Sequence, residues 1–181
     1  MPFEPALTFF KSWFSRDENW DWQSLTLDSY RSMFNRTMEE FASLDTAMSD
    51  LNPLREAGAK LLLTQGGSDE IIFPQAVVDY YNQVVEAAGG EQKAESFVRL
   101  FVTDGDGHSH VTAGPGVTLA TGMIALMRWV ECDDAPAMIM AEQADIATRN
   151  ILATRPVYAW PCKVRYVGGN LADCSSFDVE A

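Results

Sequence analysis

The sequence is poor in basic residues and contains no long apolar run. It has 13 lysines and arginines against 26 aspartates and glutamates, so its formal net charge at pH 7 is -13. Binding to nucleic-acid phosphates requires clustered lysines and arginines, and we therefore expect no nucleic-acid partner. A membrane-spanning helix needs about 20 consecutive apolar residues, and no run approaches that length. We therefore expect no membrane partner either.

Cysteine is also scarce. The three cysteines, Cys132, Cys162 and Cys174, are odd in number and lack the spacing of metal ligands. This pattern is typical of reduced thiols inside a cell, whereas a bridge between Cys162 and Cys174 would require an oxidising, secreted setting. The N-terminal stretch contains Glu4 and lacks the clean apolar core of a secretory signal. We predict a cytoplasmic protein with no metal and no cofactor.

The clearest pattern in the chain is a strand, a loop, a helix, a second strand and a second loop. Apolar runs at 59–64 and 97–102 predict the two strands, and apolar residues at helical spacing predict a helix at 74–88. A connection of this length implies a parallel pair of strands. Asp69 follows the first strand and His108 follows the second. Both residues therefore lie beyond the carboxyl ends of their strands, where open α/β sheets place ligand sites.

The rest of the chain flanks this unit. We interpret 1–181 as a single α/β domain, with a helical arm at 1–57, a strand-helix-strand-helix core at 58–134 and an irregular tail with short strands at 135–181. The arm is rich in aromatic side chains, which need a surface to lie on. The rings either pack against a neighbouring layer or subunit, or they form a platform for an aromatic substrate. The rings are Phe3, Phe9, Phe10, Trp13, Phe14, Trp20 and Trp22.

Further helices and strands are predicted on both sides of the core. Asp28 is the expected N-cap of a helix that runs to about residue 44. A second helix is expected at 117–132, with Leu119, Met123, Leu126, Met127 and Val130 on one face. Short strands are expected at 138–141, 151–154 and 163–167. Pro156 and Pro161 exclude central sheet positions.

A series of short motifs runs in order along nearly the whole chain. They are Asn19-Trp20-Asp21-Trp22, Gly58 to Leu63, Gly66 to Pro74, Asp79-Tyr80-Tyr81, Gly89-Gly90, Phe97 to Phe101, Gly105 to His108, Gly114-Pro115-Gly116, Trp129-Val130-Glu131, Ala135-Pro136 and Arg165-Tyr166. In this order they resemble the tannase and fungal feruloyl esterase family, and the chain is similar to the C-terminal third of such an enzyme. The resemblance implies a truncated α/β-hydrolase-like unit, with a short parallel sheet, packed helices and an aromatic-rich helical arm.

The resemblance also implies roles for Asp69 and His108. Members of the family use a Ser-Asp-His triad, and these two residues stand at the positions of its acid and its base. The carboxylate would orient the imidazole, which shuttles protons near neutral pH. The family's nucleophile lies in an upstream Gly-x-Ser-x-Gly-like elbow, which this chain lacks. Ser109 stands where the family has a disulfide-bonded cysteine.

Three functions compete on this basis. We predict first an enzyme in which Asp69 and His108 act by proton transfer on a hydrophobic, polyketide-like small molecule, in a cyclisation, lactonisation, dehydration or isomerisation. The first alternative is an ester hydrolase that takes its nucleophile from Ser68, Ser109 or another chain, although both serines are also ordinary turn residues. The second alternative is a non-catalytic binding subunit. The candidates for the substrate pocket are Trp20, Trp22, Phe73 and His110.

The short parallel sheet also predicts a partner. Two strands leave an open edge and an uncovered apolar face, which the N-terminal arm or another chain must cover. A two-fold dimer requires only one self-complementary patch. We therefore expect a homodimer, in which the aromatic segment 1–27 is the candidate to wrap the partner.

Overall fold

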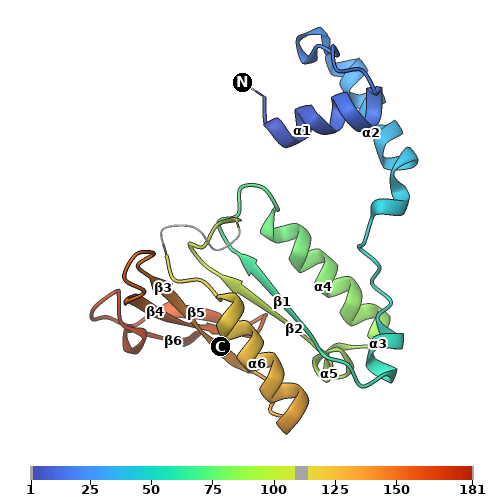
Figure 1. The fold of residues 1–181 in the computed structure, drawn as a ribbon. Helices are drawn as coiled ribbons and strands as arrows, with labels where there is room; N and C mark the ends of the chain where they lie inside the picture. The colour runs from blue at the N-terminus through green and yellow to red at the C-terminus, as the bar shows by residue number, and fades with distance from the viewer. Residues whose placement is uncertain (1, 109–113, 181) are drawn as a thin grey trace. The chain divides into compact units, whose positions relative to one another are not determined.

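The computed structural model describes residues 2–108 and 114–180. Contacts divide the chain into two compact units, Met1–Met48 and Ser49–Ala181 (Figure 1). The division falls inside the arm predicted for 1–57, so the last residues of that arm belong to the second unit. The single domain expected for 1–181 stays a prediction.

The first unit is helical, and its longest helix, α2 (Leu27–Glu40), begins at a capping box. The Thr26 hydroxyl accepts a hydrogen bond from the Ser29 N–H (3.1 Å), and the Thr26 N–H donates to Ser29 Oγ (2.9 Å). These bonds satisfy N–H groups that the start of a helix leaves unpaired. The N-cap predicted at Asp28 is wrong, because Asp28 lies in the first turn of the helix. The shorter elements are α1 (Glu4–Thr8), η1 (Phe9–Ser15), η2 (Trp22–Ser24) and η3 (Ala42–Leu44).

Aromatic rings connect the elements of the first unit. Phe10 stacks on Trp20 with 5.5 Å between the ring centroids, and Phe9 meets Phe41 edge-on at 5.2 Å. No helix in the described part of this unit contains a buried residue. Each ring pair adds only about 0.5–1.5 kcal/mol beyond the area that it buries. The unit therefore rests on a few ring contacts instead of a core.

The second unit contains a strand-helix-strand core and a tail of antiparallel hairpins. The strands of the core are β1 (Leu61–Gly66) and β2 (Val98–Thr103), which pair in parallel. The hairpins pair β3 (Met138–Ala144) with β4 (Ile151–Tyr158), and β5 (Lys163–Tyr166) with β6 (Phe177–Glu180). The helices are α3 (Asn52–Glu56), α4 (Pro74–Ala88), α5 (Glu91–Glu95), α6 (Leu119–Cys132) and η5 (Cys174–Ser176).

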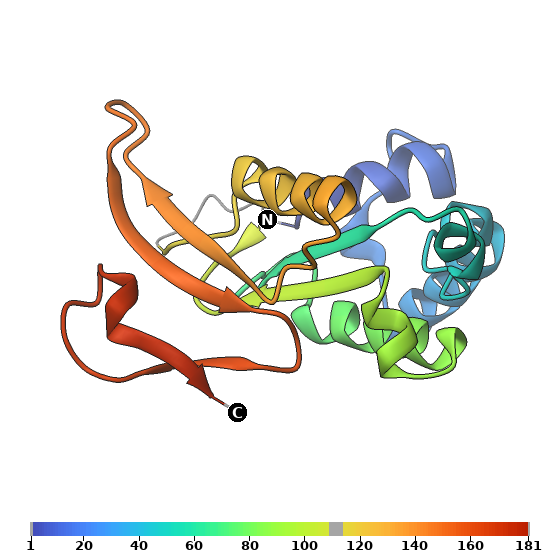
Figure 2. The ribbon, with the colours of Figure 1, turned by 90° about the horizontal axis from the view of Figure 1, so that it is seen from below.

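The predicted parallel pair is present, and its first strand lies two residues further along the chain than expected. Its register runs from Leu61 opposite Val98 to Gly66 opposite Thr103. The strand extends past residue 64 into the predicted loop, because Gln65 and Gly66 still pair with β2. Helix α6 lies on one side of the pair, and α4 and α5 lie on the other (Figure 2). The predicted α/β fold class is confirmed.

Alternate residues of the two strands face opposite sides of the pair and belong to two cores. The side chains that face α4 are Leu61, Leu63, Val98 and Leu100, and they pack with Val84 and Tyr81 of that helix. The side chains of Leu62 and Phe101 pack in the second core, with Ile139 of β3 and Val157 of β4. Because both faces are covered, the strands read as continuous apolar runs without alternation.

Helix α6 buries a different face from the predicted apolar stripe. Trp129 is 1% exposed, and Lys60 Nζ lies 5.2 Å from its ring centroid. In the predicted stripe, Leu119 is 82% exposed and Val130 is 60% exposed. Met123 and Met127 are also exposed, and Leu126 is half-buried. The apolar spacing therefore identified the helix but not the face that this chain buries.

The tail contains one more strand than the sequence predicted. Strand β6 was missed because Asp178 and Glu180 alternate with its apolar residues, and acidic residues are depleted in strands. Pro156 lies within β4, opposite Met140. A two-stranded ribbon tolerates proline because each strand has an edge on which no N–H group is needed.

Trp129 should contribute more to stability than any exposed residue of α6. Replacing Trp129 by alanine removes a fully buried side chain, so we expect the free energy of unfolding to fall by about 3–5 kcal/mol. Met127→Ala, on an exposed position of the same helix, should change it by only about 0.5 kcal/mol. Urea unfolding followed by circular dichroism measures both. Equal losses for the two variants would contradict this packing.

Candidate active site

The loop after β1 holds the Asp69 carboxylate in one orientation. Asp69 Oδ1 accepts hydrogen bonds from the N–H groups of Ile71 (2.8 Å) and Ile72 (2.9 Å). Gln65 Nε2 donates to Asp69 Oδ2 (3.2 Å) and to the carbonyl of Ile72 (3.0 Å). Aspartate commonly bonds to N–H groups two and three residues ahead in such turns. The carboxylate is therefore fixed by the turn that follows it and by the last part of β1.

His108 lies against this carboxylate from the loop after β2. Its Nδ1 is 3.2 Å from Asp69 Oδ1 and 3.1 Å from Asp69 Oδ2. The Asp69 side chain is only 6% exposed, whereas the His108 side chain is 36% exposed. The structure thus brings together the two residues that the sequence placed beyond the ends of the parallel strands. Their chemical roles stay a prediction.

The electrostatics of Asp69 determine which nitrogen of His108 carries the proton. Burial favours the neutral carboxyl, but hydrogen bonds from Ile72, Ile71, His108 and Gln65 outweigh it and lower the pKa of Asp69 from 3.8 to about 2. An ionised carboxylate can only accept, so Nδ1 of His108 must donate in this contact. In the neutral imidazole the lone pair is then on Nε2, where a general base needs it.

The loops after β1 and β2 contact each other closely, and two glycine positions near this contact have no room for a side chain. The Ser68 N–H donates to the carbonyl of Asp106 (2.8 Å). A Cβ placed on Gly66 would lie 2.6 Å from the same carbonyl oxygen. Asp106 is fully buried, and a Cβ on Gly116 would lie 2.6 Å from its Oδ2. The glycines at these positions therefore allow the loops to approach closely.

Gly116 should be sensitive to the smallest side chain. Gly116→Ala places a methyl group against the buried Asp106 carboxylate, so we expect the free energy of unfolding to fall by about 1–3 kcal/mol. Gly114→Ala is the matched control, since a Cβ there would meet the Gly105 carbonyl oxygen at an ordinary 3.5 Å. Thermal unfolding of both variants is the measurement. A Gly116→Ala protein as stable as the control would show that the Asp106 contact is not tight.

The other predicted site residues are distributed unevenly. Ser68 is exposed next to Asp69, and Phe73 is the N-cap residue of α4 and is 69% exposed. Ser109 and His110 lie outside the described residues. Trp20 and Trp22 belong to the first unit, so their part in a substrate pocket stays a prediction.

Two residues that support the pair were not identified from the sequence. Gln65 follows the strand predicted at 59–64, but it lies at the end of β1 and bonds to Asp69. Asp106 lies between two glycines of the motif Gly105 to His108, and it is completely buried. The only sequence signal for either was the nearby glycines. This signal is weak, because a polar residue between glycines in a loop is ordinarily exposed.

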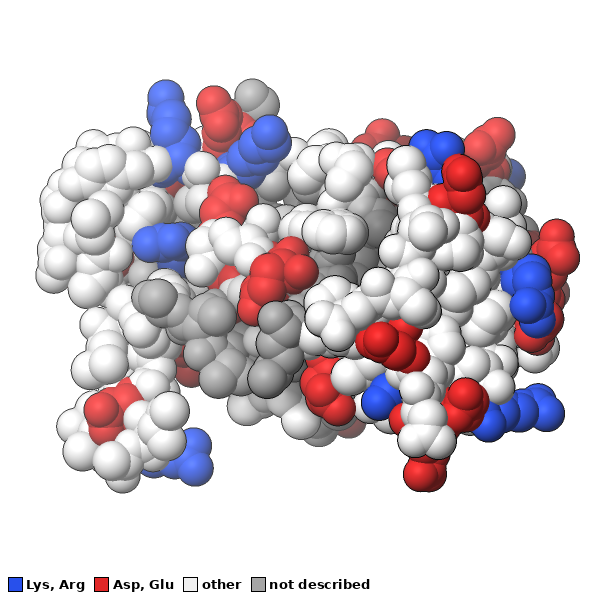
Figure 3. Space-filling model, turned by 90° about the horizontal axis from the view of Figure 1, so that it is seen from above, with Lys and Arg blue, Asp and Glu red and all other residues white. Residues whose placement is uncertain are grey.

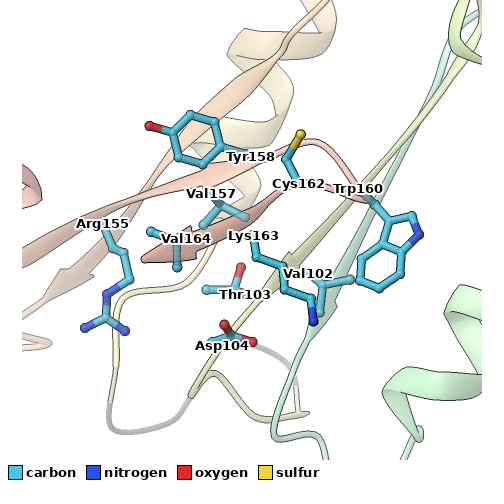
Figure 4. Close-up of a pocket in the computed structure, with 10 residues that line it drawn as sticks. All are labelled: Val102, Thr103, Asp104, Arg155, Val157, Tyr158, Trp160, Cys162, Lys163 and Val164. Atoms are coloured by element: carbon cyan, nitrogen blue, oxygen red, sulfur yellow. The ribbon is translucent and has the colours of Figure 1, made fainter. Parts of the chain in front are cut away.

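A cavity beside the site is too small for the expected substrate. It has a volume of ≈ 120 Å³ and lies between the end of β2 and strands β4 and β5. Its walls include Asp104, Arg155, Trp160 and Lys163, with the Thr103 hydroxyl among them (Figure 4). Neither Asp69 nor His108 lines it. Drug-sized ligands occupy about 300–1,000 Å³, so this space suits a few water molecules.

Surface charge, metal-ligating groups and helix hydrophobicity bear on the predicted ligands and partners. Acidic and basic side chains are interspersed on the face seen in Figure 3. Across residues 2–108 and 114–180, no group of three or more histidine, cysteine or acidic side chains is arranged to hold a metal ion. No helix in this described part of the chain is long and apolar enough to span a membrane. The homodimer and the cytoplasmic location stay predictions.

Known proteins match this chain along nearly its whole length. The family described as tannase and feruloyl esterase matches residues 6–179. A probable feruloyl esterase of Arthroderma benhamiae is 29% identical over 178 residues, which cover 98% of this chain and 33% of the relative. The mono(2-hydroxyethyl) terephthalate hydrolase of Piscinibacter sakaiensis is 33% identical over 121 residues, covering 66% of this chain and 19% of the relative.

A solved structure has the same fold. The crystal structure of an esterase from Aspergillus oryzae superposes with a TM-score of 0.80 at 22% identity. The superposition covers 99% of this chain but only 38% of the esterase. The matched part is therefore 33% of the Arthroderma benhamiae relative, 19% of the Piscinibacter sakaiensis relative and 38% of the Aspergillus oryzae esterase. With its fold, its motifs and the match over residues 6–179 in agreement, the chain belongs to the tannase and feruloyl esterase family.

Proposed function

We propose that this chain supplies the acid and the base of an ester-hydrolysing site. The observation that supports this most directly is the contact of His108 Nδ1 with the Asp69 carboxylate at 3.1 and 3.2 Å. It leaves Nε2 free to take the proton of a serine hydroxyl as that oxygen attacks the ester carbonyl. The same nitrogen then returns the proton to the departing alkoxide, and a water molecule releases the acyl group in a second cycle.

The nucleophilic serine in this proposal comes from a segment outside the described residues. Within 2–108 and 114–180, the side-chain hydrogen bonds of His108 lead to Asp69 and to no serine hydroxyl. Ser68 directly precedes Asp69, and its N–H donates a hydrogen bond to the carbonyl of Asp106. Ser109 lies outside the described residues. The unmatched part of the relatives is long enough to contain a nucleophile, because this chain spans only 33% of the Arthroderma benhamiae protein.

The proposed substrates are esters of aromatic acids. Feruloyl and terephthalate groups, which give two of the relatives their names, are both aromatic acyl groups. After Asp69 and the exposed Glu70, the side chains of Ile71, Ile72 and Phe73 are 43%, 50% and 69% exposed. An exposed apolar run beside a charged pair can hold a flat ring while the carbonyl faces the base.

The proton-transfer reactions predicted first receive no support from these relatives, which are named as esterases and hydrolases. Cyclisation, lactonisation, dehydration and isomerisation would use the same pair without a nucleophile. Covalent labelling distinguishes them from ester hydrolysis, because a fluorophosphonate reacts with an activated serine and with no general base.

Labelling and hydrolysis together test the proposal. The purified chain should neither react with a fluorophosphonate nor hydrolyse methyl ferulate, and both activities should appear once a serine-bearing hydrolase segment is present. An adduct on Ser68 or Ser109 in the isolated chain would place the nucleophile within this chain. Hydrolysis that is unchanged after His108→Ala would refute the role of the pair.

A further inference from the structure

The hydroxyl group of Thr103, at the end of β2, is buried without a hydrogen-bond partner. Thr103 is 1% exposed, and no group of the described residues pairs with its Oγ1. The backbone at this position is fixed, because the Thr103 carbonyl accepts the N–H groups of Gly67 (2.8 Å) and Asp106 (3.2 Å). Native folds pair nearly all buried polar groups, so an unpaired one indicates a bound water molecule or ion.

A second donor without a partner lies at the same place. Arg155 Nε is buried, and it meets no acceptor in the described part of the chain. Side chains two residues apart share one face of a strand, so Thr103 faces the same side of β2 as Phe101. Arg155 likewise shares a face of β4 with Val157, which packs with Phe101 in one core. The two unpaired donors therefore belong to residues that line one cavity, the ≈ 120 Å³ space between the end of β2 and strands β4 and β5.

The charged side chains around this cavity are mostly positive. Arg155 and Lys163 line it together with one carboxylate, that of Asp104, and in the view of Figure 4 Thr103 and Asp104 lie between the two cations. Within residues 2–108 and 114–180, neither cation forms an ion pair. Asp104 is exposed, so water screens its charge. Two unpaired cations therefore meet at one cavity in a chain whose net charge is -13.

The donors at this cavity are of the kinds that bind oxyanions. A guanidinium presents a planar fork of N–H groups that matches phosphate or carboxylate, an ammonium adds a point charge, and a hydroxyl donates one hydrogen bond. The Arg155 guanidinium is also held in place, since its central carbon lies 4.6 Å from the centroid of the Phe177 ring. The cavity is smaller than the roughly 300 Å³ of pockets for drug-sized ligands, so only a small ion fits.

Water and a metal cation fit these observations less well. Water molecules accept hydrogen bonds from the hydroxyl and the guanidinium, but they carry no charge to balance Arg155 and Lys163. A metal cation is repelled by the same two side chains. A small oxyanion satisfies both unpaired donors and both charges at once.

We infer that this cavity binds one small oxyanion, such as inorganic phosphate, through the Thr103 hydroxyl, the Arg155 guanidinium and Lys163 Nζ. The site is separate from Asp69 and His108, neither of which lines the cavity. The ion joins the end of β2 to β4 and β5, so its binding stabilises the second unit. The inference does not depend on ester hydrolysis.

Calorimetric titration of the chain with sodium phosphate, at pH 7 and low ionic strength, tests the site. We expect one ion per chain with a dissociation constant of about 1 mM or less. Thr103→Val replaces the hydroxyl by a methyl group, so it should weaken phosphate binding about tenfold or more. Lys163→Ala should weaken it about three- to fivefold, as an exposed cation would. Lys93→Ala is the matched control, because it removes the same charge from an exposed position on α5, and it should leave the affinity unchanged.

Thermal unfolding separates a bound ion from a general effect of salt. Phosphate at ten times its dissociation constant should raise the melting temperature of the wild type by about 3–5 °C. Without phosphate, Thr103→Val should be at least as stable as the wild type, because it removes an unpaired hydroxyl. With phosphate, the variant should gain little.

Three results would overturn the inference. The first is a titration that shows no saturable binding. The second is a stabilisation that Thr103→Val retains in full, or that sodium chloride reproduces at equal ionic strength, because salts excluded from the protein surface also stabilise folded chains. The third is an unchanged phosphate affinity in Lys163→Ala, which decides the question if Thr103→Val does not fold.

Discussion

Replacing His108 by alanine is expected to lower kcat of the assembled esterase by about 10⁴-fold or more, with little change in KM. The variant loses the nitrogen that takes the proton from the serine. Among the described residues, no other base is hydrogen-bonded to Asp69. Substrate binding should persist, since the apolar side chains that follow Asp69 remain in place. Steady-state hydrolysis of methyl ferulate gives both constants.

The stability of the His108→Ala variant serves as its control. The His108 side chain is 36% exposed, so its removal should leave the free energy of unfolding nearly unchanged. If activity falls only in proportion to a loss of folded protein, the histidine is structural and the proposed role is wrong.

Asp69→Asn is expected to lower kcat by about 10⁴-fold while preserving the shape of the site. The amide has no charge to stabilise the imidazolium, and its NH₂ group favours the histidine tautomer with its proton on the wrong nitrogen. Glu70→Gln is the matched control, because it removes an exposed carboxylate from the adjacent position. Activity of the Glu70 variant within about twofold of the wild type would show that the effect is specific to Asp69.

The same substitution has a stability effect with a defined pH dependence. The pKa of Asp69 is lowered from 3.8 to about 2 in the folded chain, so the ionised carboxylate favours the folded state. That contribution is fully present above about pH 4 and is lost as the pH falls towards about 2. The difference in unfolding free energy between wild type and Asp69→Asn should therefore shrink over this range. A difference that stays constant from neutral pH to pH 2 would contradict the lowered pKa.

Local pattern was sufficient for the elements of the core. The helix expected at 74–88 is present with those bounds, because its apolar spacing, its proline start and its glycine stop all agree. The parallel strands also followed from their apolar runs. Asp69 and His108 were identified because each follows a strand of the same parallel pair, and this topology places both loops at one edge of the sheet.

Other features depended on contacts between distant residues. Gln65 lies within β1 because the strand extends past residue 64, and this extension requires pairing with β2. From that position Gln65 bonds to Asp69. Asp106 is buried where Gly116 approaches its side chain and Gly66 approaches its carbonyl oxygen. The sequence pattern of a loop does not reveal which of its polar residues turns inward.

Helix α6 shows the same limit for packing. Its apolar stripe is what a core helix requires, yet this chain buries Trp129 on another face and leaves the stripe exposed. Periodicity reports that a face is apolar, and not what covers it.

The sequence by itself determined the strand-helix-strand unit, the family and the order of an acid and a base along the chain, because these follow from local spacing and short motifs. Only the tertiary structure decided that the imidazole meets the carboxylate at 3.1 Å, that Asp106 is buried, and that α6 buries Trp129 and not its apolar stripe. Each of these depends on how segments far apart in the sequence pack against one another. That packing is a property of the folded chain and of no single segment.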